Sequence, residues 1–341
     1  MKEATFFAKI LLISLAAGLL AFSCRKSSSS DDDTEYVGGT ITYVLPAYTA
    51  PGESYELVPK GAYTSDGSDI GFCWTVSTDT SVRDTTRHIG DPAEVTGAYT
   101  LHIPEDYMGD LTVTCYAFAE GYYTRTQSST TTVIDSEKSL VVLKPLEPSE
   151  SFFNDERDDR IYSYITIGNL DWFTSSLAYE TGRPYYNIEA MRDLFGGFYT
   201  WSDAQTACPE GWRLPTTEDW LSLATALGSE TPEPLETFPG IAGAMMANAL
   251  FNSNKMWEFN ATVKVTNSSV FSALPVGYAN VSDDRFVFAG LGNYSIFWTA
   301  NEDSEEKAFY RFLYKTSPDV MIGSAYKDYF AAQVRCVRDS E

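Results

Sequence analysis

Apolar and polar residues alternate with a period of two along much of the first half of the chain. This alternation predicts half-buried β-strands, because successive side chains of a strand point to opposite faces. Turn-forming pairs such as Pro51-Gly52 and Asp66-Gly67 separate the strands. Short strands at this spacing predict an all-β, immunoglobulin-like sandwich over residues 37–146. The expected strands are residues 40–44, 54–58, 71–76, 99–103, 111–117 and 127–134.

The predicted sandwich contains two cysteines, Cys73 and Cys115, which fall as a pair, and an even number of cysteines in an exported chain favours disulfides. Trp74 directly follows Cys73, so these two side chains point to opposite faces of one strand. A Cys73–Cys115 disulfide could therefore join neighbouring strands instead of bridging two sheets. The kind of sandwich and the connectivity of these two cysteines stay open.

The pattern changes after a linker at residues 147–159, which includes a proline and a charged run. Two stretches with helical features come first in the region that follows, and short strands fill its last third. Early helices and late strands predict an α+β domain over residues 160–341. Its expected strands are residues 161–167, 168–172, 271–278, 285–289, 294–298, 308–314 and 333–337.

Threonines indicate where the two helices of this domain begin. Thr200 can cap the first helix with its hydroxyl, and Asp203 then lies in the first turn, at the positive end of the helix. The second helix is expected to begin at Thr216 or Thr217 and to end at Gly228.

The N-terminal residues are typical of exported proteins. Residues 1–23 combine a short basic start with an apolar core too brief to span a bilayer, which predicts a signal peptide. Residues 20–24 resemble a bacterial lipobox, which implies lipidation of Cys24. An ordinary cleaved signal followed by an unmodified cysteine is the alternative.

Residues 24–36 are rich in Ser and Asp and predict a flexible tether. They resemble the surface-export signal of Bacteroidota lipoproteins. The expected location is therefore the outer membrane, with a lipid anchor and with the protein facing the cell exterior. A spacer that faces the periplasm is the alternative.

Charge and histidine content restrict the function. Lys and Arg number 24 and Asp and Glu 47, which gives a formal net charge of −23. Such a chain repels phosphates, so no nucleic-acid partner is expected, and the membrane is contacted only through the lipid anchor. The two histidines, His88 and His102, both lie in the first domain, so the second domain cannot assemble a Ser-His-Asp or Cys-His pair. We expect no catalytic residues and no enzyme.

Five separated motifs in the second half are specific enough to indicate a family. They begin at Gly197 (Gly-Phe-Tyr-Thr-Trp-Ser-Asp-Ala), Cys208 (Cys-Pro-Glu-Gly-Trp-Arg-Leu-Pro), Phe271 (Phe-Ser-Ala-Leu-Pro-Val-Gly-Tyr), Phe297 (Phe-Trp-Thr-Ala) and Val334 (Val-Arg-Cys-Val-Arg-Asp). In this order they resemble the Fibrobacter succinogenes major paralogous domain family over roughly residues 161–339. The resemblance implies a C-type-lectin-like fold. It also implies a disulfide between Cys208, after the first helix, and Cys336, in the last strand.

The implied lectin-like fold raises the question of calcium. Sugar-binding C-type lectins hold calcium through a Glu-Pro-Asn or Gln-Pro-Asp loop and a following Trp-Asn-Asp, and neither occurs here. The nearest set of oxygen ligands is Asn301, Glu302 and Asp303, which suits calcium chemically. We expect no metal site and no cofactor, with calcium at these three residues as the alternative.

Aromatic residues near predicted loops are the other candidates for ligand contact. Sugars stack on exposed rings through their apolar faces. The candidates are Trp257, Tyr278, Tyr294 and Tyr326. Burial in the core is the competing interpretation, above all for Trp257.

Taken together, the sequence predicts a surface lipoprotein with a non-catalytic binding or adhesion role, whose ligand is a glycan or a surface protein. Specificity is expected in residues 228–271 and 299–333, and the insert at residues 228–267 is the first place to look. A structural or tip subunit of a surface appendage is one alternative function. An atypical enzyme with a carboxylate site is the other.

Overall fold

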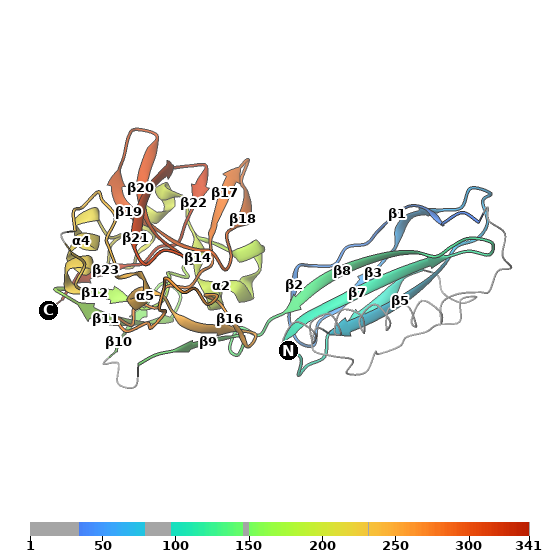
Figure 1. Cartoon of the computed structure of the whole chain (residues 1–341), viewed down its shortest axis with the longest axis horizontal. Helices are drawn as coiled ribbons and strands as arrows, with labels where there is room; N and C mark the ends of the chain where they lie inside the picture. The colour runs from blue at the N-terminus through green and yellow to red at the C-terminus, as the bar shows by residue number, and fades with distance from the viewer. Residues whose placement is uncertain (1–33, 79–96, 146–149, 231, 341) are drawn as a thin grey trace. The chain divides into compact units, whose positions relative to one another are not determined.

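The computed structural model describes residues 34–78, 97–145, 150–230 and 232–340 (Figure 1). The chain divides into two compact units, up to Ile134 and from Asp135 onward. The predicted signal peptide, the lipidation site Cys24 and the tether up to residue 33 lie outside the described residues. In the part of the chain that is described, no helix is both long and apolar enough to cross a membrane.

The described part of the first unit consists of strands. Its main sheet has the order β2-β8-β7-β5, in which β7 pairs antiparallel with both β5 and β8. Two further pairs, β1 with β4 and β3 with β6, complete it. The strands are β1 Gly38–Thr42, β2 Tyr48–Thr49, β3 Ser54–Leu57, β4 Lys60–Tyr63, β5 Gly71–Thr78, β6 Tyr99–His102, β7 Gly109–Phe118 and β8 Arg125–Val133. Alternate residues of these strands form the core around Trp74, Leu101, Val113 and Cys115, as the period-two pattern predicts.

The cysteines of the first unit do not pair with each other, so the expected Cys73–Cys115 disulfide is wrong. In the register of β5 and β7, Cys73 lies opposite Tyr116 and Trp74 lies opposite Cys115. Residues directly opposite each other share a face, so the two cysteine side chains point to opposite sides of the sheet. Cys115 is a free thiol buried in the core, and this burial raises its pKa to about 12.

The second unit begins earlier than the sequence indicates. Strand β9 (Leu140–Leu143), expected in the sandwich, pairs antiparallel with β15 (Asn248–Phe251) of the second unit. Strand β10 (Ser151–Asp155), expected in the linker, pairs with β11 (Arg160–Ile167). The expected boundaries at residues 146 and 160 therefore cut through structure that belongs to the second unit.

One sheet of the second unit joins its two ends. The order is β10-β11-β12-β23, with β12 at Leu170–Phe173 and the last strand, β23, at Val337–Asp339. The predicted disulfide between Cys208 and Cys336 is present and spans 128 residues of sequence. Closing a loop of this length stabilises a fold by about 4–5 kcal/mol in the chain-entropy account.

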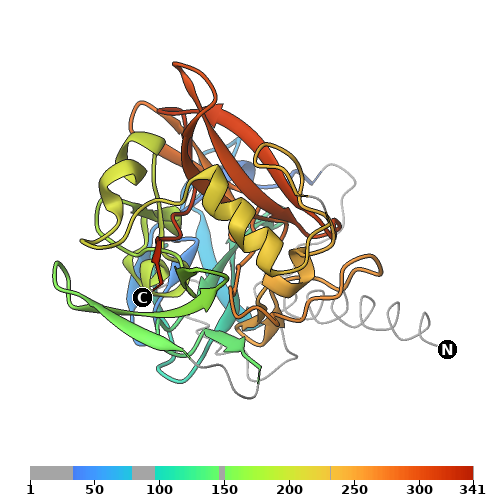
Figure 2. The ribbon, with the colours of Figure 1, turned by 90° about the vertical axis from the view of Figure 1, so that its left-hand side faces the viewer.

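The two predicted helices are confirmed together with their caps. In α3 (Trp201–Ala207), Thr200 accepts a hydrogen bond from the Asp203 amide. In α4 (Thr217–Ala226), Thr216 and Asp219 cap each other reciprocally. Helix α4 lies beside β19, as Figure 2 shows. The other helical segments among the described residues are the 3-10 turn η1 Tyr185–Asn187, α2 Glu189–Phe195 and α5 Ala242–Met245.

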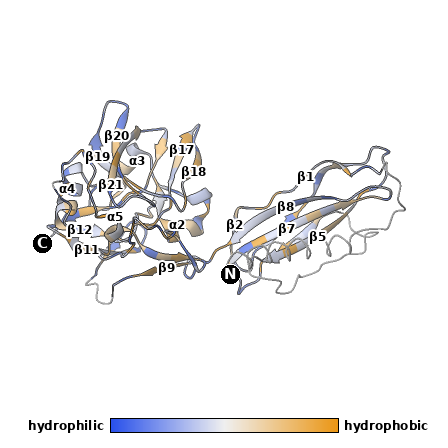
Figure 3. Ribbon diagram, in the orientation of Figure 1, coloured by the Kyte–Doolittle hydropathy of each residue, from blue (hydrophilic) through white to orange (hydrophobic). Residues whose placement is uncertain are grey.

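The late strands form two three-stranded sheets, β19-β20-β21 and β18-β17-β22. Figure 3 shows apolar and polar residues interspersed along the strands of both units. The strands are β17 Tyr278–Ser282, β18 Arg285–Ala289, β19 Tyr294–Glu302, β20 Lys307–Tyr314, β21 Val320–Tyr326 and β22 Phe330–Ala331, and shorter pieces are β13 Arg183–Pro184, β14 Gly197–Phe198 and β16 Asn254–Lys255.

The expected strand at residues 271–278 is wrong. Val270 and Ser272 adopt positive φ angles of 60° and 56°, which no strand tolerates, and the segment runs as an irregular loop. Its Phe271 is fully buried between Trp172 and Trp220, so the apolar pattern there reflects core packing.

Candidate ligand-binding groove

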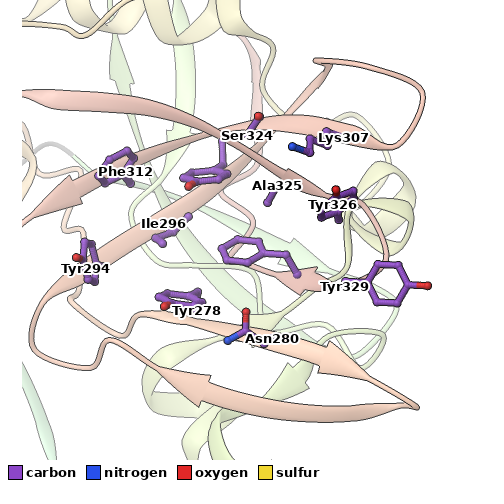
Figure 4. A pocket seen from close by; sticks show the side chains of 12 residues that line it. Tyr278, Asn280, Tyr294, Ile296, Lys307, Phe312, Ser324, Ala325, Tyr326 and Tyr329 are labelled. Carbon is purple, nitrogen blue, oxygen red and sulfur yellow. The ribbon is translucent and has the colours of Figure 1, made fainter.

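A groove of about 580 Å³ lies between the two late sheets (Figure 4). One wall comes from β17 and β22, and the other from β19, β20 and β21. We call it the aromatic groove and define it by its lining residues: Tyr278, Asn280, Tyr294, Ile296, Lys307, Tyr310, Phe312, Ser324, Ala325, Tyr326, Tyr329 and Phe330.

Strand register explains why aromatic side chains gather on one wall. Phe312 lies opposite Ile296, and Tyr310 lies opposite Trp298 on β19 and Gly323 on β21. Paired residues share a face of the sheet, and residues two apart on one strand share it too. A β-carbon at Gly323 would approach the Tyr310 ring to 2.5 Å. The Tyr310 ring therefore lies across the position that this glycine leaves empty.

Three rings form a continuous stack across the groove. Phe330 stacks on Tyr278 with 5.2 Å between ring centroids, and on Tyr310 with 5.4 Å. Trp298 meets Phe330 edge-on at 5.5 Å. Trp298 is itself fully buried, and its indole N–H donates to the backbone oxygen of Tyr199 at 2.9 Å. The floor of the groove thus rests on a fixed core residue.

Polar atoms in the groove have no internal partner. The hydroxyls of Tyr278, Tyr294 and Tyr310, all half-buried, make no hydrogen bond to any described residue, and the exposed side-chain amide of Asn280 makes none either. Burial raises the pKa of Tyr310, and Tyr278 and Tyr294 add to the rise. The Tyr310 hydroxyl therefore stays protonated, and all three hydroxyls are open to hydrogen bonds with a ligand.

One end of the groove carries its exposed rings and its charge. Tyr326 and Tyr329 are 48% and 66% exposed and lie edge-on to each other at 6.3 Å. The Lys307 ammonium lies 4.8 Å from the centre of the Tyr326 ring. Lys307 is the one charged side chain among the lining residues, and none of them is acidic. Tyr294 and Phe312 lie toward the other end (Figure 4).

The chain matches the Fibrobacter succinogenes major domain over residues 165–338, which is about half of its length. The protein belongs to this family. All residues that line the aromatic groove lie within the matched region, so the groove is part of the major domain itself.

Comparison with characterised proteins adds little to the family assignment. No curated protein matches this chain. Among solved structures, the adhesin InvE of Yersinia pseudotuberculosis matches with 12% sequence identity and a TM-score of 0.24. That match covers 89% of this chain and 70% of the adhesin chain.

The major domain brings together three of the aromatic residues that the sequence indicates, Tyr278, Tyr294 and Tyr326. Trp257 is separate: it is 4% exposed, and its indole N–H donates to the backbone oxygen of Ala273 at 2.9 Å. Trp257 packs in the core and also borders a smaller cavity of about 300 Å³. A ligand role for any of the four stays a prediction.

The side chains of two of the three calcium candidates have partners in the major domain. Asn301 accepts a hydrogen bond from the Thr217 amide at the start of α4, at 2.8 Å. Glu302 forms an ion pair with Lys327 at 2.8 Å. The Asp303 amide donates to the Lys307 carbonyl in the β19–β20 turn. Over the described residues, no three His, Cys, Asp or Glu side chains come close enough together to hold a metal ion.

The sequence indicates three of the seven aromatic residues that line the groove and misses the other four. Tyr310 and Phe312 were assigned only to a strand, and Tyr329 and Phe330 were not singled out. The alternation of aromatic residues at 310, 312 and 314 was the available signal, because it places three rings on one face of a strand. The insert at residues 228–267, the first place to look, instead contributes much of its apolar content to the core through Phe238, Ile241, Ala242, Met245, Met246, Trp257 and Val263.

Proposed function

We propose that the major domain is a non-catalytic binding module of a surface lipoprotein, and that the aromatic groove holds its ligand, a glycan or a surface protein. The observation that carries this proposal is the coincidence of flat rings with unpartnered hydroxyls in one groove. Aromatic residues with a polar handle are enriched wherever proteins bind partners, since one side chain supplies both contact area and hydrogen bonds.

A C-type-lectin-like fold for the major domain belongs to the same proposal. Its support is the order of elements, with α3 and α4 early, short strands late, and a disulfide from the end of α3 to the last segment. An immunoglobulin-like layout of the first unit is supported by Trp74, which is buried on β5 in the central sheet. In this arrangement a β-rich first unit follows the lipid anchor and the second unit carries the binding site.

We propose a non-catalytic role because the groove lacks the residue types that the usual hydrolytic mechanisms need. Histidine is absent from the second half of the sequence, and the aromatic groove contains no carboxylate among its lining residues. Neither a nucleophile with its base nor a pair of acids for glycoside hydrolysis is present there. Release of reducing sugar from any glycan by the purified protein would argue for the enzyme alternative.

The anchor is tested separately from the binding site. Lipidation at Cys24 predicts incorporation of labelled palmitate into the wild-type protein and none into Cys24→Ala. Exposure on the cell surface predicts that external protease removes the protein from intact cells. Protection until the outer membrane is permeabilised would place it in the periplasm.

The binding role is tested on arrays of glycans and of extracellular proteins, with calcium and with a chelator. The Tyr278→Ala/Tyr294→Ala variant should lose the signal that the wild-type protein gives. Phe152→Ala is the matched control, because this ring is 70% exposed on β10 and lies outside the groove. Binding that the double variant retains in full would sink the assignment of the groove, and loss on chelation would point to calcium.

A further inference from the structure

Resting on the proposed binding function, we infer that the aromatic groove selects a neutral saccharide chain of several sugar units, which lies lengthwise along β19, β20 and β21. Three properties of the groove support this ligand class: its length, its charge and the state of its backbone.

The groove is longer than a single sugar ring. Tyr294 at one end lies opposite Tyr314 on β20, and Tyr326 at the other end lies opposite Lys307. These two positions are separated by seven residues of β20, which at the rise of a strand corresponds to roughly 24 Å. Aromatic rings occur at both ends and in the middle (Figure 4). A chain of several units can contact all of them, whereas a monosaccharide can reach only one group.

Charge favours a neutral chain. No lining residue is acidic, so the groove offers no carboxylate to form an ion pair with a cationic ligand. Its lysine, Lys307, follows directly on the β19–β20 turn, where Asp303, Glu305 and Glu306 are all exposed. The whole chain carries a formal charge of −23. An acidic saccharide would approach against this field, while a neutral one is unaffected by it.

The paired backbone of the two central strands argues against an extended peptide that adds to them. Peptides commonly bind by adding a strand to an open sheet edge. Strand β17 lies between β18 and β22, and β20 lies between β19 and β21, so the central strand of each wall is already paired on both sides. Recognition there depends on rings, hydroxyls, the Asn280 amide and the Lys307 ammonium. This combination suits the apolar faces and hydroxyl groups of sugars.

The test is calorimetric titration of the full chain with cello-, xylo-, manno- and malto-oligosaccharides, each from monomer to hexamer, and with oligogalacturonates as the charged counterpart. For at least one neutral series, affinity should rise with chain length over several units. It should change less than twofold when sodium chloride is raised, because no charge pair is formed.

Variants at different positions along the groove separate the contributions of these positions to the affinity. Tyr326→Ala/Tyr329→Ala should remove the gain from the longest chains and leave the affinity for short ones. Tyr278→Ala should weaken all lengths about tenfold or more, and Tyr278→Phe should weaken them less, since the ring stays and only the hydroxyl is lost. Phe152→Ala should titrate like the wild-type protein.

Two results would overturn this inference while the proposed function survives. One is groove-dependent binding of oligogalacturonates that is tighter than any neutral series and weakens steeply with salt. The other is an array hit confined to protein ligands and lost in Tyr278→Ala/Tyr294→Ala. If no glycan or protein on the arrays depends on the groove, the proposed function fails as well.

Discussion

At the scale of single residues, the groove depends on contacts that fix where a ring lies. The Tyr310 ring stacks on Phe330. It also lies across the space that Gly323 leaves open, because glycine has no side chain. A β-carbon at this position would force the Tyr310 ring to shift, although the φ angle at Gly323 is not in the left-handed region. Gly323 therefore provides the space that the Tyr310 ring occupies in the groove.

Gly323→Ala should therefore displace Tyr310, lower the free energy of unfolding by about 1–3 kcal/mol and weaken ligand binding. Chemical denaturation and calorimetric titration measure the two effects. In a Tyr310→Ala background the same substitution should cost much less, because the clash is gone. Equal costs in both backgrounds would show that the contact between these two residues is not the reason for the glycine.

This contact also shows why part of the site escaped prediction. Tyr278, Tyr294 and Tyr326 could be named from sequence because each lies next to a predicted loop. Tyr310 lies in the middle of a strand, where an aromatic residue usually packs in a core. Its place in the groove depends on a register with β21 and on Phe330, which no local pattern reveals.

The buried phenol groups of Tyr162 and Tyr199 make the free energy of unfolding depend on pH in the alkaline range. Burial raises the pKa of Tyr162 from 10.0 to about 12, and its hydroxyl oxygen accepts a hydrogen bond from the Ala178 amide. Burial also raises the pKa of Tyr199 well above its usual value. The unfolded chain ionises these groups near pH 10 while the folded protein keeps them protonated. Their contribution to the free energy of unfolding is complete below pH 10. It is lost as the pH rises through the pKa values of the folded protein.

The free energy of unfolding should therefore fall between pH 10 and pH 12. Tyr162→Phe should make that fall shallower, because one of the ionising groups is removed. At pH 7 the same variant should lose about 1 kcal/mol through the missing hydrogen bond. Urea denaturation at a series of pH values measures both. A Tyr162→Phe profile parallel to that of the wild-type protein throughout this range would contradict the assignment.

At the scale of elements, the sequence predicts features that depend on neighbouring residues, such as helix caps. It does not predict features that depend on partners far away in the chain. Helices α3 and α4 begin where Thr200 and Thr216 predict, since a cap involves residues only three apart. Strand β9 was assigned to the wrong unit because its partner β15 follows about 100 residues later. The strand expected at residues 271–278 failed for a similar reason, as its apolar residues serve a core assembled from several elements.

The cap of α4 should contribute more than the cap of α3. The Asp219 carboxylate accepts a hydrogen bond from the Thr216 amide at 2.7 Å and also forms an ion pair with Arg213. Thr216→Ala should lower the free energy of unfolding by about 1–2 kcal/mol. Thr200→Ala is the matched control and should cost less, because no described residue forms an ion pair with Asp203. Thermal and urea denaturation give the comparison, and an equal or reversed order would contradict it.

At the scale of the whole molecule, the chain consists of two units that are each stabilised by their own contacts. The second unit includes β9 and β10 and is closed by the Cys208–Cys336 disulfide, so it extends beyond the family match at residues 165–338. The family motifs predicted its centre and its disulfide well. They carried no information about its first strands, which lie outside the matched residues.

A fragment of residues 135–341 should therefore fold without the first unit and unfold in one cooperative transition. A fragment of residues 147–341 lacks β9, which leaves β15 unpaired on that side and removes the hydrogen bond from the Asn252 amide to the Ser139 carbonyl. We expect it to be less stable by about 2 kcal/mol or more. Equal midpoints for the two fragments in urea would show that β9 is dispensable.

The most direct test of the central claim is to map the surface that a ligand protects in the full chain. Hydrogen–deuterium exchange would be followed by mass spectrometry with and without the tightest-binding oligosaccharide of the titration series. If the aromatic groove is the binding site, exchange should slow in peptides that cover β17, β19, β20, β21 and β22. Protection confined to residues 228–267 or to the first unit, with the late strands unchanged, would contradict it.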